Sequence, residues 1–206
     1  EAGGTLPNVR LAYETWGTLS PTADNVVLLP HALTGDSHVI GAAGPGHRTP
    51  GWWDDIVGPG LAINTDTYFV IAPNILGGCQ GSTGPSSFAP DGREWGSRFP
   101  YLTVRDQSNA MLALLDTLGI TRVAALIGGS MGGMHVLEIA AMAPERVGAL
   151  AVLASTAETT ADQIAMNAVQ LDAIRTDQAF AGGDYYDAVE GPHRGLGDVP
   201  PARGAA

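Results

Sequence analysis

Short apolar runs alternate with polar and with glycine- or proline-rich stretches along the chain. The runs that favour strands cover residues 8–17, 25–30, 67–74, 122–128 and 146–154. The central runs are almost continuously apolar, which is typical of strands that are covered on both faces in a parallel sheet. This pattern predicts a sheet that is mostly parallel.

Helical patterns occupy the intervals between these runs. In "TVRDQSNAMLALLDTLGI" (residues 103–120) apolar residues recur at helical spacing, Thr103 and Asp106 are placed to form a capping box, and Gly119 is a natural stop. This helix connects two predicted strands, as in a βαβ crossover. A second amphipathic helix is predicted at residues 159–176. The fold class is therefore α/β, with helices flanking the sheet.

Composition and charge exclude several classes of partner and mechanism. The chain has 206 residues, 45% of them hydrophobic, one cysteine and a formal net charge of −11. The charge argues against nucleic-acid and anionic-membrane partners. All ten basic residues are arginines, so a Walker A lysine and a Schiff-base lysine are both excluded. No apolar stretch reaches the roughly 20 residues of a membrane span, and the first residues lack signal-peptide features. We expect a cytoplasmic enzyme.

The candidate chemistry centres on the stretch "LIGGSMGGM" (residues 126–134). Its Gly128-x-Ser130-x-Gly132 spacing falls between a predicted strand and a predicted helix, which is the setting of a nucleophile elbow. Glycines allow close approach of strand and helix while the serine is held in a strained conformation. The Met131 N–H would then face a tetrahedral oxyanion. The alternative interpretation is a glycine-rich packing turn.

A second oxyanion donor is expected in the loop that follows residues 25–30. This loop reads "HALTGDSH" (residues 31–38) and holds the position of the oxyanion loop in α/β-hydrolases, with the Leu33 N–H as the expected donor. His31 precedes Ser130, whereas in this fold the catalytic base follows the serine. We therefore expect His31 to orient the loop.

Seven segments, in this order, extend the evidence beyond the elbow: "HALTGDSH", "GWWDDIVGPG", "NILGGCQGSTGPSS", "WGSRFP", "VRDQ", "IGGSMGGM" and "GGDYY". Together, from about residue 5 to Leu196, they resemble the homoserine O-acetyltransferase family. The resemblance implies an α/β-hydrolase core (residues 1–154), followed by the beginning of a helical lid and an irregular tail (residues 155–206), with the last strands of the fold missing.

The resemblance also implies an activity. Members transfer an acetyl group from acetyl-CoA to the hydroxyl of L-homoserine, a step toward methionine, and Ser130 would carry the acetyl group as an ester. Acetyl-CoA is then a co-substrate, and no tightly bound cofactor is expected. Related members use succinyl-CoA or accept on serine, and the sequence does not separate these. Dimers are common in the family, so a homodimer is an expectation.

The acid–base pair that such a reaction needs is not found in the sequence. After Ser130 the histidines are His135, on the elbow helix, and His193, in a Gly/Pro-rich segment. We expect neither to be catalytic. The family pattern stops after "GPHRGL", and the displaced position of Arg203 behind two prolines does not assign it a substrate role. The alternatives are a serine esterase, or an inactive truncated fragment with little turnover.

Two further groups are expected to be incidental. Cys79 has no nearby base in the sequence, so we expect it to be an incidental thiol and not a nucleophile. The spacing of His31, His38 and His47 matches no usual ligand pattern, and no cysteine or carboxylate cluster joins them. The sequence therefore predicts no metal site.

Overall fold

The computed structural model describes residues 4–186, 188 and 191–192. It divides into two compact units: residues 1–83 with 101–157, and residues 84–100 with the chain from residue 158 onward. The predicted division into a core (residues 1–154) and a lid with a tail (residues 155–206) stays a prediction. His193 and Arg203 lie outside the described residues.

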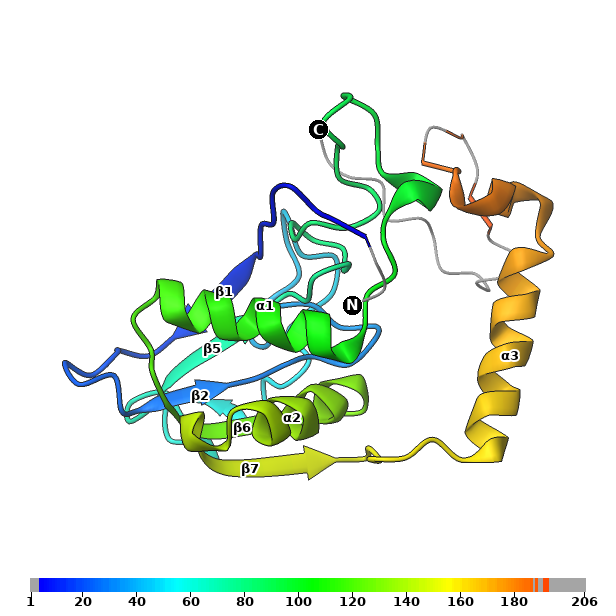
Figure 1. Cartoon of the computed structure of the whole chain (residues 1–206). Coiled ribbons are helices and arrows are strands. Elements are labelled where there is room, and N and C mark those ends of the chain that lie inside the picture. Colours follow the sequence, from blue (N-terminus) through cyan, green and yellow to red (C-terminus); the bar gives the residue numbers. More distant parts are fainter. Residues whose placement is uncertain (1–3, 187, 189–190, 193–206) are drawn as a thin grey trace. The chain divides into compact units, whose positions relative to one another are not determined.

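A five-stranded sheet forms the centre of the first unit, in the order β1-β5-β2-β6-β7 (Figure 1). Only the β1–β5 pair is antiparallel; the other neighbours run parallel. The predicted mostly parallel sheet is therefore confirmed. The strands are β1 (Tyr13–Trp16), β2 (Val26–Leu28), β5 (Phe69–Pro73), β6 (Val123–Gly129) and β7 (Val147–Leu153).

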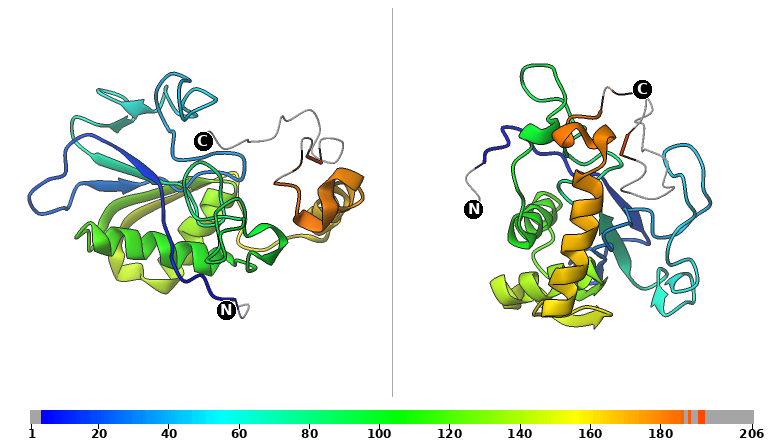
Figure 2. Two further views of the ribbon diagram at one scale, coloured as in Figure 1. Left: turned by 90° about the horizontal axis from the view of Figure 1, so that it is seen from above. Right: turned by 90° about the vertical axis from the view of Figure 1, so that its right-hand side faces the viewer.

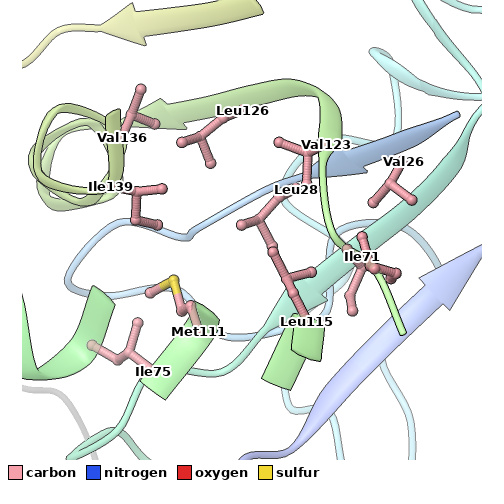
Figure 3. Close-up of a cluster of buried hydrophobic side chains, with 11 residues drawn as sticks. Val26, Leu28, Ile71, Ile75, Met111, Leu115, Val123, Leu126, Val136 and Ile139 are labelled. Atoms are coloured by element: carbon pink, nitrogen blue, oxygen red, sulfur yellow. The ribbon is translucent and has the colours of Figure 1, made fainter. Parts of the chain in front are cut away.

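Two helices, α1 (Val104–Thr117) and α2 (Met131–Met142), cover one face of this sheet (Figure 1). Apolar side chains from the strands meet those of the two helices in a cluster (Figure 3). Its members are all buried: Val26, Leu28, Ile71, Ile75, Met111, Leu115, Ile120, Val123, Leu126, Val136 and Ile139. Removing this apolar surface from water is the main stabilising contribution to the unit.

The opposite face of the sheet is covered by the segment between β2 and β5 (Figure 2). Val39, Val57 and Ile63 from this segment pack on buried strand residues, and the rings of Trp52 and Trp53 lie against the same cluster. The segment also contains a two-stranded parallel sheet, β3 (Val57–Gly58) and β4 (Ile63–Asn64). Trp52 and Trp53 are therefore packing residues of the core.

Helix α1 begins as predicted. The Thr103 side chain accepts a hydrogen bond from the Asp106 N–H, and the Asp106 carboxylate accepts from the Thr103 N–H at 2.8 Å. This reciprocal capping box satisfies donors that the first helical turn would otherwise leave unpaired. A short 3-10 helix, η2 (Pro144–Arg146), leads from α2 into β7.

Strand β7 ends the described sheet and is only thinly covered. Its burial is low along most of its length, and Leu150 and Leu153 are half exposed. An edge strand with exposed apolar residues offers unpaired backbone groups to another chain segment. The described part of the first unit thus has an open sheet edge.

The second unit contains α3 (Ala161–Arg175) and two 3-10 helices, η1 (Gly96–Arg98) and η3 (Gln178–Gly183). The Asp184 carboxylate joins its two parts, because it accepts from the Ser97 N–H at 2.7 Å and from the Ser97 hydroxyl at 2.9 Å. Helix α3 matches the predicted helix, but it buries no residue in the described structure. No helix in the described part of the chain has the length and apolar character to cross a membrane.

Candidate functional site

Ser130 occupies the turn between β6 and α2. Its backbone has φ 53° and ψ −123°, a conformation that residues with a side chain rarely adopt. The Ser130 N–H donates to the Leu153 carbonyl at 2.9 Å, and its carbonyl accepts from the Gly133 N–H at 2.9 Å. The residue is exposed. The predicted strand–serine–helix turn is present, with the serine held in a strained backbone and accessible to solvent.

The glycines around Ser130 are required by close backbone contacts. A Cβ on Gly128 would collide with the Gly132 carbonyl, and a Cβ on Gly132 would collide with the Pro30 carbonyl oxygen. A Cβ on Gly133 would lie 2.6 Å from the Ser155 Cβ. The simple packing-turn interpretation explains these contacts but not the strained serine between them. The contact of Gly132 with Pro30 also shows that the turn lies against the loop after β2.

Leu33 and Met131 hold the two predicted donor positions. Strands β2 and β6 are parallel neighbours, with Leu28 opposite Leu126, so the loops at their carboxyl ends lie at the same edge of the sheet. Within the described residues, neither the Leu33 nor the Met131 N–H donates a hydrogen bond. Both amides are therefore free to donate to a negatively charged oxygen, the role that the sequence predicts for them.

His31 has the structural position expected for it. Its ring is buried, its Nε2 lies 3.1 Å from both the Ile75 nitrogen and the Asn74 Oδ1, and its Nδ1 lies 2.7 Å from the Ala32 carbonyl. Burial lowers the pKa of His31 and favours the neutral ring. With both nitrogens engaged, His31 fixes the Leu33 loop against the loop after β5.

His135 is also buried, and its ring contacts helix α1. Its Nε2 lies 2.8 Å from the Gln107 Oε1, and the Gln107 amide donates to the Leu76 carbonyl at 2.9 Å. Burial, with a smaller contribution from His31, lowers the pKa of His135 to about 4. The neutral ring therefore joins α2 to α1 and to the loop after β5, which agrees with the expected structural role.

The Ser130 hydroxyl has no hydrogen-bond partner among the residues that the structure describes. The absence of a general base and an orienting carboxylate stays a prediction. Cys79 is an exposed free thiol whose carbonyl accepts a hydrogen bond from the Asn74 amide. Its role as an incidental thiol stays a prediction.

One expectation about the histidines is wrong. Glu14 of β1 lies 3.1 Å from the Nδ1 of His38 and 3.7 Å from the Nε2 of His47 through its two carboxylate oxygens. A carboxylate therefore joins two of the three histidines that the sequence considered, while His31 is elsewhere. The signal was the period of two in β1: Glu14 lies on the same half-buried face as Trp16, which packs on the core.

The fold and this turn define the class. The chain belongs to the alpha/beta hydrolase fold family, which matches residues 25–202. Within that class it is similar to homoserine O-acetyltransferases. It is 65% identical over 198 residues to the one from Leifsonia xyli subsp. xyli, covering 95% of this chain and 49% of that relative. It is 63% identical to the one from Thermobifida fusca, covering 96% and 52%.

Solved structures give the same class with two activities in their names. Esterase E22 is 35% identical with a TM-score of 0.86, over 94% of this chain and 55% of that one. Homoserine O-acetyltransferase from Bacillus anthracis is 33% identical with a TM-score of 0.84, over 91% and 52%. The chain spans about half the length of the curated relatives that it matches. These likenesses confirm the α/β-hydrolase fold.

Proposed function

We propose that this chain carries the nucleophile and the oxyanion donors of a homoserine O-acetyltransferase. The observation that supports this most directly is the strained, exposed Ser130 in the β6–α2 turn, which lies against the loop after β2 through the contact of Gly132 with Pro30. The names of relatives at 54–65% identity supply the acetyl group and the homoserine acceptor. Acetyl-CoA is the proposed donor and L-homoserine the proposed acceptor.

The proposed reaction has two steps, acetylation of Ser130 and transfer of the acetyl group to homoserine. The Ser130 Oγ attacks the thioester carbonyl and loses its proton to a general base, while the Leu33 and Met131 amides stabilise the oxyanion. The carbon–sulfur bond then breaks, and coenzyme A leaves with the proton. In the second step the homoserine hydroxyl gives its proton to the base and attacks the acetyl ester of Ser130, and the oxyanion forms at the same two amides. The bond between the acetyl carbon and the Ser130 Oγ then breaks, Oγ takes the proton back, and O-acetylhomoserine leaves.

Ester hydrolysis is the second candidate. It is favoured by the similarity to esterase E22 and to an acetylester hydrolase from Corynebacterium glutamicum, which is 31% identical with a TM-score of 0.81. Both reactions pass through an acyl-serine and differ in whether water or an amino-acid hydroxyl resolves it. The turn at Ser130 serves either reaction, so the acceptor must be measured.

The test supplies acetyl-CoA, or an activated phenyl acetate, to the 206-residue chain and follows acetylation by intact-mass and peptide mass spectrometry. We expect an acetyl group on Ser130 that homoserine removes faster than water does. Ser130→Ala should lose the adduct, while Ser86→Ala, an exposed serine in the second unit, should retain it. Steady-state turnover should be low, because no described residue hydrogen-bonds the Ser130 hydroxyl.

The outcomes separate the candidates. An adduct that water removes as fast as homoserine does would favour the esterase. Equal acetylation of the wild-type chain and Ser130→Ala would contradict both proposals, since both require the hydroxyl at that turn.

A further inference from the structure

Glu14, His38 and His47 form a group of side chains that the proposed reaction at Ser130 does not use. One donor atom from each residue can be chosen so that all three lie within 4.8 Å of one another. Glu14 comes from β1, whereas His38 and His47 come from the segment that covers the second sheet face. Residues far apart in the sequence thus bring two imidazoles and a carboxylate together within the first unit.

The distances are close to those that one small cation requires. A zinc-type ion binds nitrogen and carboxylate oxygen at about 2.0–2.2 Å, so two of its ligand atoms are at most about 4.4 Å apart. The Glu14 Oε2 and His38 Nδ1 are 3.1 Å apart, and the Glu14 Oε1 and His47 Nε2 are 3.7 Å apart. Both pairs lie within this limit, each through a different carboxylate oxygen of Glu14, and one donor atom from each of the three residues lies within 4.8 Å of the others.

The polar groups of this cluster are incompletely satisfied. The His38 Nε2 and the His47 Nδ1 are buried without a hydrogen-bond partner among the described residues. These two nitrogens are not the proposed ligand atoms, because Glu14 faces the His38 Nδ1 and the His47 Nε2. An ordered water is a common partner for buried nitrogens of this kind. The Ser37 hydroxyl donates to the Glu14 Oε1 at 2.9 Å, which orients the carboxylate as outer residues do in metal sites.

The two rings show which part must move. They are stacked with centroids 3.9 Å apart and planes only 13° apart, whereas an ion lies near the plane of each imidazole that binds it. The His38 side chain is 9% exposed and the His47 side chain 30% exposed. The more exposed His47 ring is therefore the one that turns to bring its nitrogen toward the ion.

We propose that Glu14, His38 and His47 bind one divalent transition-metal ion of the zinc class. Two imidazoles with one carboxylate are a donor set for Zn²⁺ or Co²⁺, whereas Ca²⁺ and Mg²⁺ require mainly oxygen ligands. The ion would connect β1 to the segment 37–47, which follows the Leu33 loop by only a few residues. Its binding would therefore fix the far end of that loop.

The test titrates the chain, with any affinity tag removed and after chelator treatment, with Co²⁺ and follows the visible d–d absorption. We expect saturation at one equivalent, displacement by Zn²⁺ but not by Mg²⁺, and a rise in melting temperature. His47→Ala and Glu14→Gln should weaken binding by at least about tenfold. The matched controls, His193→Ala and the exposed Asp66→Asn, should bind as the wild-type chain does.

A second variant keeps the result independent of folding defects. His47→Cys replaces one zinc-type ligand by another, so it should retain Co²⁺ and add a sulfur-to-metal charge-transfer band. Circular dichroism of each variant checks that the fold is kept. Absence of saturation at one equivalent, or binding by His47→Ala equal to that of the wild-type chain, would overturn the proposal.

Discussion

At the scale of single residues, Ser130 combines backbone strain with an exposed hydroxyl. Conformations of this kind cost of order 1–3 kcal/mol and persist only where neighbouring structure enforces them. Here the Leu153 carbonyl and the first turn of α2 hold Ser130 on both sides. The local cost is therefore a consequence of how the turn between β6 and α2 holds Ser130.

This strain makes a prediction about stability. The free energy of unfolding of Ser130→Gly should be about 1 kcal/mol higher than that of Ser130→Ala, because glycine adopts a positive φ without strain. The greater freedom of glycine in the unfolded chain offsets part of this gain. Urea denaturation of both variants measures the difference. Both lack the hydroxyl, so lost chemistry is common to the pair. An alanine variant as stable as the glycine variant would show that the turn is not strained.

At the scale of elements, the β6–α2 turn and the loop after β2 position one another. Gly132 sits so close to the Pro30 carbonyl oxygen that no side chain fits between them. Gly129, three positions earlier, is different: a Cβ there would lie 3.7 Å from the Leu153 carbonyl oxygen, an ordinary contact. Two glycines in the same motif thus have different requirements.

These two positions give a matched pair of substitutions. Gly132→Ala should lower the free energy of unfolding by about 2 kcal/mol or more, because backbone atoms must move to admit the methyl group, and should abolish acetylation of Ser130 by displacing the Leu33 loop. Gly129→Ala should change both far less. Thermal melts and the acetylation assay check this. Equal effects at the two positions would contradict the proposed close approach.

Prediction from sequence was most accurate where burial is continuous. The runs at residues 25–30, 67–74 and 122–128 correspond to β2, β5 and β6, since strands covered by other layers leave a clear apolar signal. The run at 146–154 corresponds to β7, which is apolar although thinly covered in the described structure. The run at 8–17 shortened to β1, because Arg10 and Ala12 donate instead to the Thr83 and Ser82 side chains. Strands β3 and β4, of two residues each, carry too short a pattern to detect.

Some parts of the candidate sites could likewise be predicted from the sequence and others could not. The glycine spacing around Ser130 is local and was readable, whereas the meeting of Glu14 with His38 and His47 depends on how distant segments pack. The amphipathic pattern of α3 predicted a buried face, yet Ile164 and Val169 are exposed in the described structure. Periodicity identifies a helix but does not state what it packs on.

At the scale of the whole molecule, a chain of polar groups runs through the interior of the first unit. His135 on α2, Gln107 on α1 and the Leu76 carbonyl are linked by two hydrogen bonds. The chain depends on a neutral imidazole, because the buried ring has no partner for a second proton at Nδ1 among the described residues. Protonation of His135 therefore opposes the packing of α1 and α2.

This gives the molecule a pH-dependent stability with a defined sign. The folded pKa of His135 is lowered to about 4 from 6.5, so the unfolded chain binds the proton first as pH falls. Stability should decrease from about pH 6.5 down to about pH 4, by about 3 kcal/mol in all from this residue. Urea denaturation across that range measures it.

His135→Gln supplies the control, since an amide can still donate to Gln107 but does not titrate. Its stability should depend less on pH over the same interval. The pKa of His38 departs in the other direction: burial lowers it, but the hydrogen bond and charge of Glu14 outweigh burial and raise it. Its stabilising contribution is present at low pH and is lost as pH rises through that raised pKa. Identical slopes for wild type and His135→Gln would exclude His135 as the source.

The segment between β2 and β5 contributes to both the candidate site and the core. It first presents the Leu33 amide, and some residues later it lays Val39, Trp52 and Trp53 over the second face of the sheet. The Trp52 indole donates to the Asp36 carbonyl at 3.1 Å, so the packing residue Trp52 is bonded to the loop that contains Leu33. A substitution that disturbs how Val39, Trp52 or Trp53 packs on the sheet should therefore also displace the Leu33 amide, because one continuous stretch of chain holds both.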